Sequence, residues 1–252
     1  IILSSKAFAG VTFVDSFDIS GQQQYPHAVQ FNNDGTKMFV TGSGSGVGED
    51  VKDAVNEYTL STAFDVSTAS YVDSFDYSSQ ESNARALAFN NDGTKMFVMG
   101  TGSDDVNEYT LSTGFDVSTA SFVDSFDVSS QDEGPSEVQF NIDGTKMFIV
   151  GYMNDNVYEY TLSTGFDVSS ASYVGSFDIS SQEATPNGLA FSADGTKMFI
   201  VGSSGDDINE YSLVSPYSLI NVTGEHDGDV LGDDTDADDS ASLTVTSYRT
   251  GA

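Results

Sequence analysis

The residues of this chain that could do chemistry recur at fixed spacing. The hexapeptide DGTKMF occurs at residues 34–39, 92–97, 143–148 and 194–199, and each copy contributes one lysine at the same position. These lysines are Lys37, Lys95, Lys146 and Lys197. Four equivalent cations could ring one site, whereas an exposed lysine in a turn only offsets the aspartates beside it. We favour the second interpretation, and we assign the Met and Phe that follow each lysine to the core.

Acidic loops form a second recurring group. SDDVNEY at 103–109, NDNVYEY at 154–160 and GDDINEY at 205–211 each place carboxylates just before an alternating segment. Asp105, Asp155 and Asp207 are weak candidates for Ca²⁺ ligands, because Ca²⁺ prefers oxygen donors. Turn-forming aspartates are the alternative, and we favour it. The glutamates of the repeat would form an acidic ring if they face a central channel and would be solvated otherwise. They are Glu57, Glu108, Glu159 and Glu210.

The segment from residue 227 to 239 is dense in aspartate, and its DTDADD at 234–239 places carboxylates at alternate positions. Oxygen-rich Ca²⁺ sites favour that spacing. The candidate ligands are Asp233, Asp234, Asp236, Asp238 and Asp239. The segment differs from an EF-hand loop, having no Gly at the sixth place and no Glu at the twelfth. An acidic linker is the alternative. We predict Ca²⁺ as the cofactor of the chain.

A catalytic site is not predicted. His27 and His226 lie in unlike contexts, and neither has neighbours at the spacing of a triad or a zinc site. Cysteine is absent, and no serine lies in a nucleophile-elbow pattern. An enzymatic site breaks repeat symmetry, whereas these copies are nearly identical. We therefore predict a protein without enzymatic activity, and the sequence identifies no ligand-binding residue.

Composition narrows the classes of partner. The 252 residues carry 8 basic and 39 acidic side chains, a net charge of −31, which repels nucleic acid and anionic lipid. No run of 18 apolar residues exists, so we predict no membrane insertion. A first residue of Ile suggests a processed chain, and a secreted chain without cysteine would rest on its core or on metal ions. We expect an extracellular or cell-surface location, or the surface of a virion.

The elements that carry these residues are short strands. In the second copy, ALAFN at 86–90 and KMFVM at 95–99 flank an Asn-Asp-Gly turn, which predicts a type I′ hairpin. VNEYTL at 106–111 alternates in polarity, and FVDSFD at 122–127 is rich in aromatic and β-branched residues. Four consecutive antiparallel strands in about 50 residues are the size and order of a propeller blade. The spacings of 58, 51 and 51 residues predict four blades.

The ends of the array suggest closure. SPYSLI at 215–220 replaces the expected fourth strand of the last copy, while a spare FVDSFD lies at 13–18. We predict that the spare strand completes the last blade and closes a four-bladed ring. Half of an eight-bladed ring made by two chains, a part of a longer ring, and an open solenoid are the alternatives. The first copy has seven extra residues between Gly42 and Ala54, which suit either binding or a tolerated insertion.

Two resemblances extend this interpretation. FNNDGTKMFVMG and FSADGTKMFIVG resemble blades of YVTN-type and gluconolactonase-type bacterial β-propellers, which implies that architecture from residue 13 to about 213. The segment 228–251 resembles the opening of a VCBS or cadherin-like repeat of large surface adhesins. We therefore divide the chain into a leader segment at 1–11, the propeller at 12–221, and an acidic linker with a partial repeat at 222–252.

These observations lead to one main functional hypothesis. We predict a non-catalytic, calcium-assisted module for adhesion or recognition, with glycans or surface proteins as partners, since equivalent blades would gain avidity. The first alternative is a self-associating spacer, coat or filament subunit. The second alternative is a metal-dependent hydrolase of the lactonase type.

Overall fold

The computed structural model describes residues 13–43, 53–205 and 207–220, which contain fifteen strands and three single-turn 3₁₀ helices. Blade 1 consists of β1 (Tyr25–Phe31), β2 (Lys37–Ser43), β3 (Ala54–Leu60) and β4 (Ala69–Asp76). Blade 2 consists of β5 (Ala84–Phe89), β6 (Lys95–Gly100), β7 (Asp105–Leu111) and β8 (Ala120–Asp127). Blade 3 consists of β9 (Pro135–Phe140), β10 (Lys146–Gly151), β11 (Asn156–Leu162) and β12 (Ala171–Asp178). Blade 4 consists of β13 (Pro186–Phe191), β14 (Lys197–Gly202) and β15 (Ile208–Ser212).

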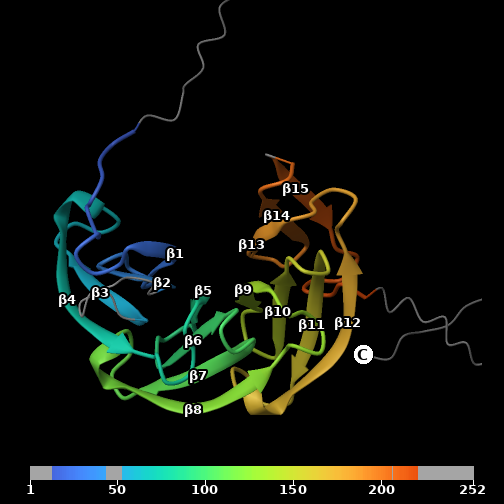
Figure 1. The fold of residues 1–252 in the computed structure, drawn as a ribbon, viewed down its shortest axis with the longest axis horizontal. Coiled ribbons are helices and arrows are strands. Elements are labelled where there is room, and N and C mark those ends of the chain that lie inside the picture. Colours follow the sequence, from blue (N-terminus) through green and yellow to red (C-terminus); the bar gives the residue numbers. More distant parts are fainter. Residues whose placement is uncertain (1–12, 44–52, 206, 221–252) are drawn as a thin grey trace, which may run out of the picture. The chain divides into compact units, whose positions relative to one another are not determined.

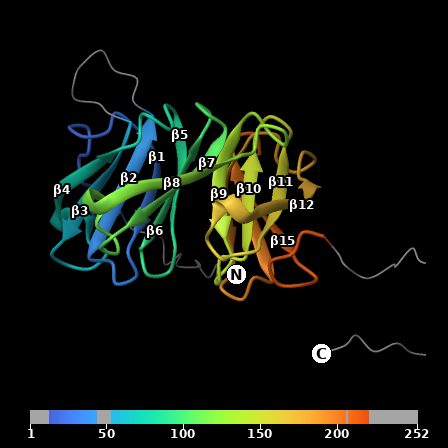
Figure 2. The ribbon, with the colours of Figure 1, turned by 90° about the horizontal axis from the view of Figure 1, so that it is seen from below.

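Each blade is a separate antiparallel sheet whose strands pair in chain order. The inner strands of consecutive blades contact one another, namely β1 with β5, β5 with β9, and β9 with β13. Figure 1 shows the four blades in sequence, and Figure 2 shows the same strands from below. The predicted all-β propeller of four blades is therefore confirmed.

The core lies between blades. In the joint between blades 1 and 2, Phe39 and Val55 pack against Leu87, Met96 and Val98, and all five are fully buried. The joints between blades 2 and 3 and between blades 3 and 4 repeat this pattern. A blade thus buries both faces only when it has a neighbour on each side, as in other stacked repeats. The prediction that the Met and Phe of DGTKMF are core residues is confirmed for blades 1 to 3.

The hairpin turn differs from the predicted type I′. Among the turn residues 90–94, only Gly93 has a positive φ, of 71°. The Asp92 carboxylate accepts hydrogen bonds from the backbone N–H and the hydroxyl of Thr94. The turn spans five residues, and the Asn90 N–H donates to the Lys95 carbonyl across it. Three-residue and longer hairpin loops commonly place a glycine in the left-handed region in this way.

The glycine of this turn also faces an aromatic ring. A Cβ on Gly93 would lie 2.3 Å from the ring of Phe115. We expect Gly93→Ala to lower the free energy of unfolding by about 2–4 kcal/mol, because the new methyl group meets both a left-handed backbone and the ring. Gly21→Ala is the control, since its Cβ would meet no atom within 4 Å. Denaturant unfolding of both variants measures the difference, and equal stabilities would contradict the packing argument.

The predicted ring closure differs from the structure. Blade 4 has three strands, and residues 13–18 form no strand; Phe13 and Val14 are 80% and 89% exposed. Phe17 instead packs edge-on against Tyr58 of blade 1, with ring centroids 5.6 Å apart. Phe75 of β4 packs in the same way against Tyr109 of blade 2. Phe17 therefore lies against blade 1 as an outer strand lies against the blade that follows it.

Several predictions fall outside the described residues. These are the leader at 1–11, the inserted loop at 44–52 and the aspartates proposed as Ca²⁺ ligands near residue 235. The chain divides after Leu219, and the second unit begins at Ile220. In the described residues, no helix is long and apolar enough to cross a membrane.

Candidate functional site

The repeated lysines and glutamates form ion pairs between blades. Lys95 Nζ lies 2.6 Å from Glu108 Oε1, and it also donates to the carbonyl of Phe166 in blade 3 at 2.6 Å. The second oxygen of Glu108 accepts the N–H of Val168 at 2.9 Å. Since the Glu108 side chain is only 2% exposed, this pair and the loop at 166–168 make a buried joint. We call the arrangement the Lys–Glu clamp.

The clamp recurs at each joint. Lys37 and Glu57 bind Phe115 and Val117 of blade 2. In the third joint, Lys146 donates to the Tyr217 carbonyl, and Glu159 accepts the N–H of Leu219. SPYSLI therefore keeps the clamp contact even though it lacks the fourth strand.

These positions correct two interpretations. The lysines of blades 1 to 3 are joint residues rather than simple turn cations, and their glutamates neither ring a channel nor lie in solvent. A signal was present in the sequence, because Lys and Glu recur 13 residues apart in the last three copies. It escaped notice because the third partner, a backbone loop, lies 60 to 78 residues further along the chain.

The structure does not bring the candidate blade-loop aspartates together. Asp105 begins β7 opposite Asp127, and burial raises its pKa. Asp155 has a φ of 52°, and burial followed by the charges of Asp132 and Asp178 raises its pKa. The Asp207 carboxylate accepts a hydrogen bond from the side-chain amide of Asn209. Over residues 13–43, 53–205 and 207–220, no three His, Asp or Glu side chains form a group that could hold a metal ion. Calcium binding by these loops stays a prediction.

The repeat symmetry breaks at the inner strands. Each inner strand has a β-bulge near its start, and the bulge position carries a different polar side chain in every blade. These side chains are His27, Arg85, Ser136 and Asn187. Bulges re-aim side chains and are common beside functional sites. Because the rest of the blade is nearly constant, this is the place where the chain could carry one specific site.

One carboxylate on an inner strand has an unusual environment. Burial raises the pKa of Glu137 on β9 to about 7, although the amide of Gln139 and the N–H of Val138 donate to it at 3.3 and 3.1 Å. The equivalent residues are Ala28, Ala86 and Gly188, so Glu137 is specific to blade 3. A carboxylate that titrates near neutral pH in a cavity is suited to take up a proton.

One cavity is lined by Glu137, and a second is lined by its hydrogen-bond partner Gln139. A cavity of about 300 Å³ lies beside Glu137 itself, and Gly188, Ala190, Phe199 and Ile208 are among its other lining residues. A second cavity, of about 220 Å³, is lined by Gln30, Gln139 and other residues of blades 1 to 4. Because Gln139 donates to Glu137, one hydrogen bond joins the two linings. Carboxamides beside a titrating carboxylate suit a ligand that carries hydroxyl groups.

Arg85, at the bulge of β5, is a candidate anion-binding residue on another inner strand. In the described part of the chain, each lysine is paired with a glutamate, whereas the buried Nε of Arg85 has no hydrogen-bond partner. Burial and, to a lesser extent, the charge of Arg85 lower the pKa of His27, which places the two side chains in one electrostatic environment. Arg85 could therefore receive an anionic group. Sequence reasoning missed Arg85 and Glu137 because it searched for recurring residues rather than for breaks in the repeat.

Comparison with known proteins supports the fold. No family model matches the chain, and no curated protein matches its sequence. A provisionally named 6-phosphogluconolactonase from Bacteroides uniformis has a similar structure, with a TM-score of 0.54 and 13% identity over 74% of this chain. A similarly named protein from Bacteroides fragilis gives a TM-score of 0.51 and 15% identity over 80% of this chain. The β-propeller domain of Cps50 (Swd1) from Myceliophteria thermophila gives 0.50 and 12% over 75%.

The chain spans about half the length of these proteins, namely 50%, 55% and 53%. At these identities the likeness shows a propeller fold. It supports the resemblance to gluconolactonase-type propellers, and nothing in it supports a VCBS or cadherin-like repeat. The predicted role in adhesion is contradicted, because two of these similar propellers bear lactonase names and nothing in the comparisons supports adhesion.

Proposed function

We propose that this chain binds and hydrolyses sugar lactones. The observation that carries the proposal is the break in repeat symmetry on the inner strands, where Glu137 titrates near pH 7 and Arg85 has an unpartnered Nε. The names of the similar propellers indicate the substrate class. The acidic composition, which suits a chain that stays dissolved in a salty medium, supports our further proposal that the chain works outside the cytoplasm.

The chemistry follows from these side chains. The Glu137 carboxylate would take a proton from a water molecule whose oxygen attacks the lactone carbonyl carbon. The bond between that carbon and the ring oxygen would break, and the released alkoxide would take the proton back to give the open hydroxy acid. Arg85 would hold an anionic substituent such as a phosphate. Gln30 and Gln139 would bind sugar hydroxyls.

The test is hydrolysis of gluconolactone and of its 6-phosphate by the purified chain, followed as acid release above the spontaneous rate. We expect Arg85→Gln to raise the KM for the phosphorylated lactone by about 10–100-fold, because a charge-assisted hydrogen bond is lost. The uncharged lactone should be affected little, which makes it the internal control. No acceleration of either substrate by the unmodified chain would overturn the proposal.

A further inference from the structure

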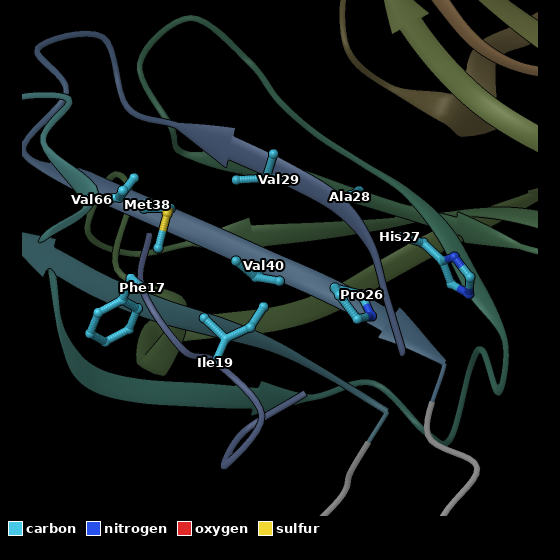
Figure 3. A pocket seen from close by; sticks show the side chains of 9 residues that line it. All are labelled: Phe17, Ile19, Pro26, His27, Ala28, Val29, Met38, Val40 and Val66. Atoms are coloured by element: carbon cyan, nitrogen blue, oxygen red, sulfur yellow. The ribbon is translucent and has the colours of Figure 1, made fainter. Parts of the chain in front are cut away.

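The two ends of the blade array each expose one half of a blade-to-blade joint. We define the head face as the side of blade 1 that no other blade covers in the described residues, formed by Phe17, Ile19, Val29, Met38, Val40 and Val66. The tail face is the opposite side of blade 4, formed by Lys197, Phe199, Val201, Ile208 and Glu210. Figure 3 shows the head face, where Phe17 and Ile19 lie beside Met38 and Val40.

The same positions are buried wherever two blades meet. Met99 and Val106 of blade 2 are fully buried against blade 3, whereas their tail-face equivalents Val201 and Ile208 are 46% and 71% exposed. On the head side, Val29 is 54% exposed, and its equivalent Leu87 is fully buried. The internal joints therefore show what would cover each face, namely the face at the other end of the array.

In the described residues, the clamp at the tail face has its Lys–Glu pair but lacks the backbone loop that binds this pair in the internal joints. Lys197 pairs with Glu210, as in the other blades, but the two side chains are 48% and 51% exposed. The loop that would fill this clamp begins at Phe64 of blade 1, which has a φ of 58° and is 61% exposed. Phe115, which fills the first clamp, has a φ of 57°. Asp65 accepts from the Ser67 N–H, just as Asp116 accepts from Ser118 in the filled loop.

The outer strand that blade 4 lacks also has its matching sequence at the other end of the array. β15 has no partner on its outer edge in the described residues, and residues 13–18 carry the sequence of an outer strand without forming one. By analogy with β3 and β4, Phe17 would pair with Ile208 and Asp15 with Glu210. Through its contact with Tyr58, Phe17 already lies against blade 1 as Phe75 of β4 lies against blade 2.

We propose that two copies of this chain join head to tail, twice, into one ring of eight blades. Each head face would cover the tail face of the other copy, and residues 13–18 of each would complete blade 4 of the other. The comparisons favour a second copy over closure of a single chain, because these four blades match about half of a propeller domain. Phe199 and Ile208 also line the cavity beside Glu137, so the joint would cover that cavity, and we expect lactone hydrolysis from the separate copies at low ionic strength.

The charge of the chain gives this association a defined salt dependence. Each copy carries a net charge of −31, so the two copies repel each other at low ionic strength. At 1 M salt the screening length is about 3 Å, and the apolar faces can then associate with little repulsion. Sedimentation should show the mass rising toward twice 26.7 kDa with added salt.

Cross-linking distinguishes the arrangements. Asn33 Nδ2 donates to the Asn91 carbonyl at 2.7 Å, and Asn91 Nδ2 donates to the Ile142 carbonyl at 2.7 Å, so these side chains link equivalent turns of consecutive blades. Ala193 is the equivalent residue of blade 4. The chain has no cysteine, and the variant Asn33→Cys with Ala193→Cys therefore places thiols only at the proposed joint. The control is Asn33→Cys with Asn91→Cys, whose thiols span an internal joint.

A short bis-maleimide at 1 M salt should convert the first variant into a covalent dimer and the control into an internally linked monomer. An internally linked monomer of the first variant would overturn the proposal in favour of a closed four-bladed ring. A ladder of longer products would overturn the two-copy ring, and an unlinked product beside a linked control would overturn any joint between head and tail. None of these outcomes depends on lactone hydrolysis.

Discussion

Glu108→Ala should lower the free energy of unfolding by about 3–5 kcal/mol, which is typical of the loss of one partner from a buried ion pair. The Glu108 side chain is 2% exposed, and its two oxygens accept from Lys95 and from the Val168 N–H. Without the carboxylate, the partly buried Lys95 ammonium group loses its counter-ion and keeps only the Phe166 carbonyl, while the buried N–H of Val168 loses its partner. Denaturant unfolding of the variant and of the unmodified chain gives the difference.

The chain supplies a matched control in blade 4. Glu210 makes the same ion pair with Lys197, but its side chain is 51% exposed, and within the described part of the chain no loop of a following blade reaches it. Glu210→Ala should therefore cost at most about 1 kcal/mol, as for other surface pairs, when measured where the chain is monomeric. Equal losses in the two variants would show that the clamp stabilises single blades rather than the joints between them.

The repeat made the strands predictable because each blade forms from local contacts. KMFVM at residues 95–99 and VNEYTL at 106–111 both lie in strands, since their alternation and apolar content reflect pairing with neighbouring segments. The Lys–Glu clamp was not predictable in the same way. It joins Lys95 and Glu108 to a loop 60 to 71 residues away, and only the packing of blades brings that loop into contact.

The candidate site was missed for a different reason. Near-identical copies suggested a protein without catalysis, but the inner strands carry unlike residues at equivalent positions, such as Arg85 and Ser136. The raised pKa of Glu137 depends on its burial in the folded chain, so the sequence alone could show only that this blade has Glu where the others have Ala or Gly. Closure was mispredicted because the sequence FVDSFD at 13–18 shows only that this segment can form a strand. Whether it pairs with β15 depends on the position of the last blade, which the sequence does not give.

Glu137→Gln should reduce lactone hydrolysis by about 10²–10⁴-fold, the usual contribution of a general base. In the unmodified chain, kcat/KM should rise with pH through about 7, because only the ionised carboxylate takes up a proton. The residual activity of the variant should have lost this rise. Glu133→Gln, which changes an exposed carboxylate four residues earlier, is the control and should keep both the rate and the pH profile.

As the pH rises through about 7, the stability of the unmodified chain should fall while its activity rises. Since folding raises the pKa of Glu137 from an ordinary 4.5 to about 7, the folded state favours the neutral carboxyl group. The stability associated with the neutral form is present below pH 4.5 and is lost as the pH rises through 7, and a shift of this size corresponds to about 3 kcal/mol. Glu137→Gln cannot ionise, so it should match the unmodified chain near pH 4.5 and exceed its stability by about 2–3 kcal/mol at pH 8. A carboxylate retained at such a cost, and needed for turnover, would be a functional residue; one whose replacement left both stability and hydrolysis unchanged would be neither buried nor catalytic.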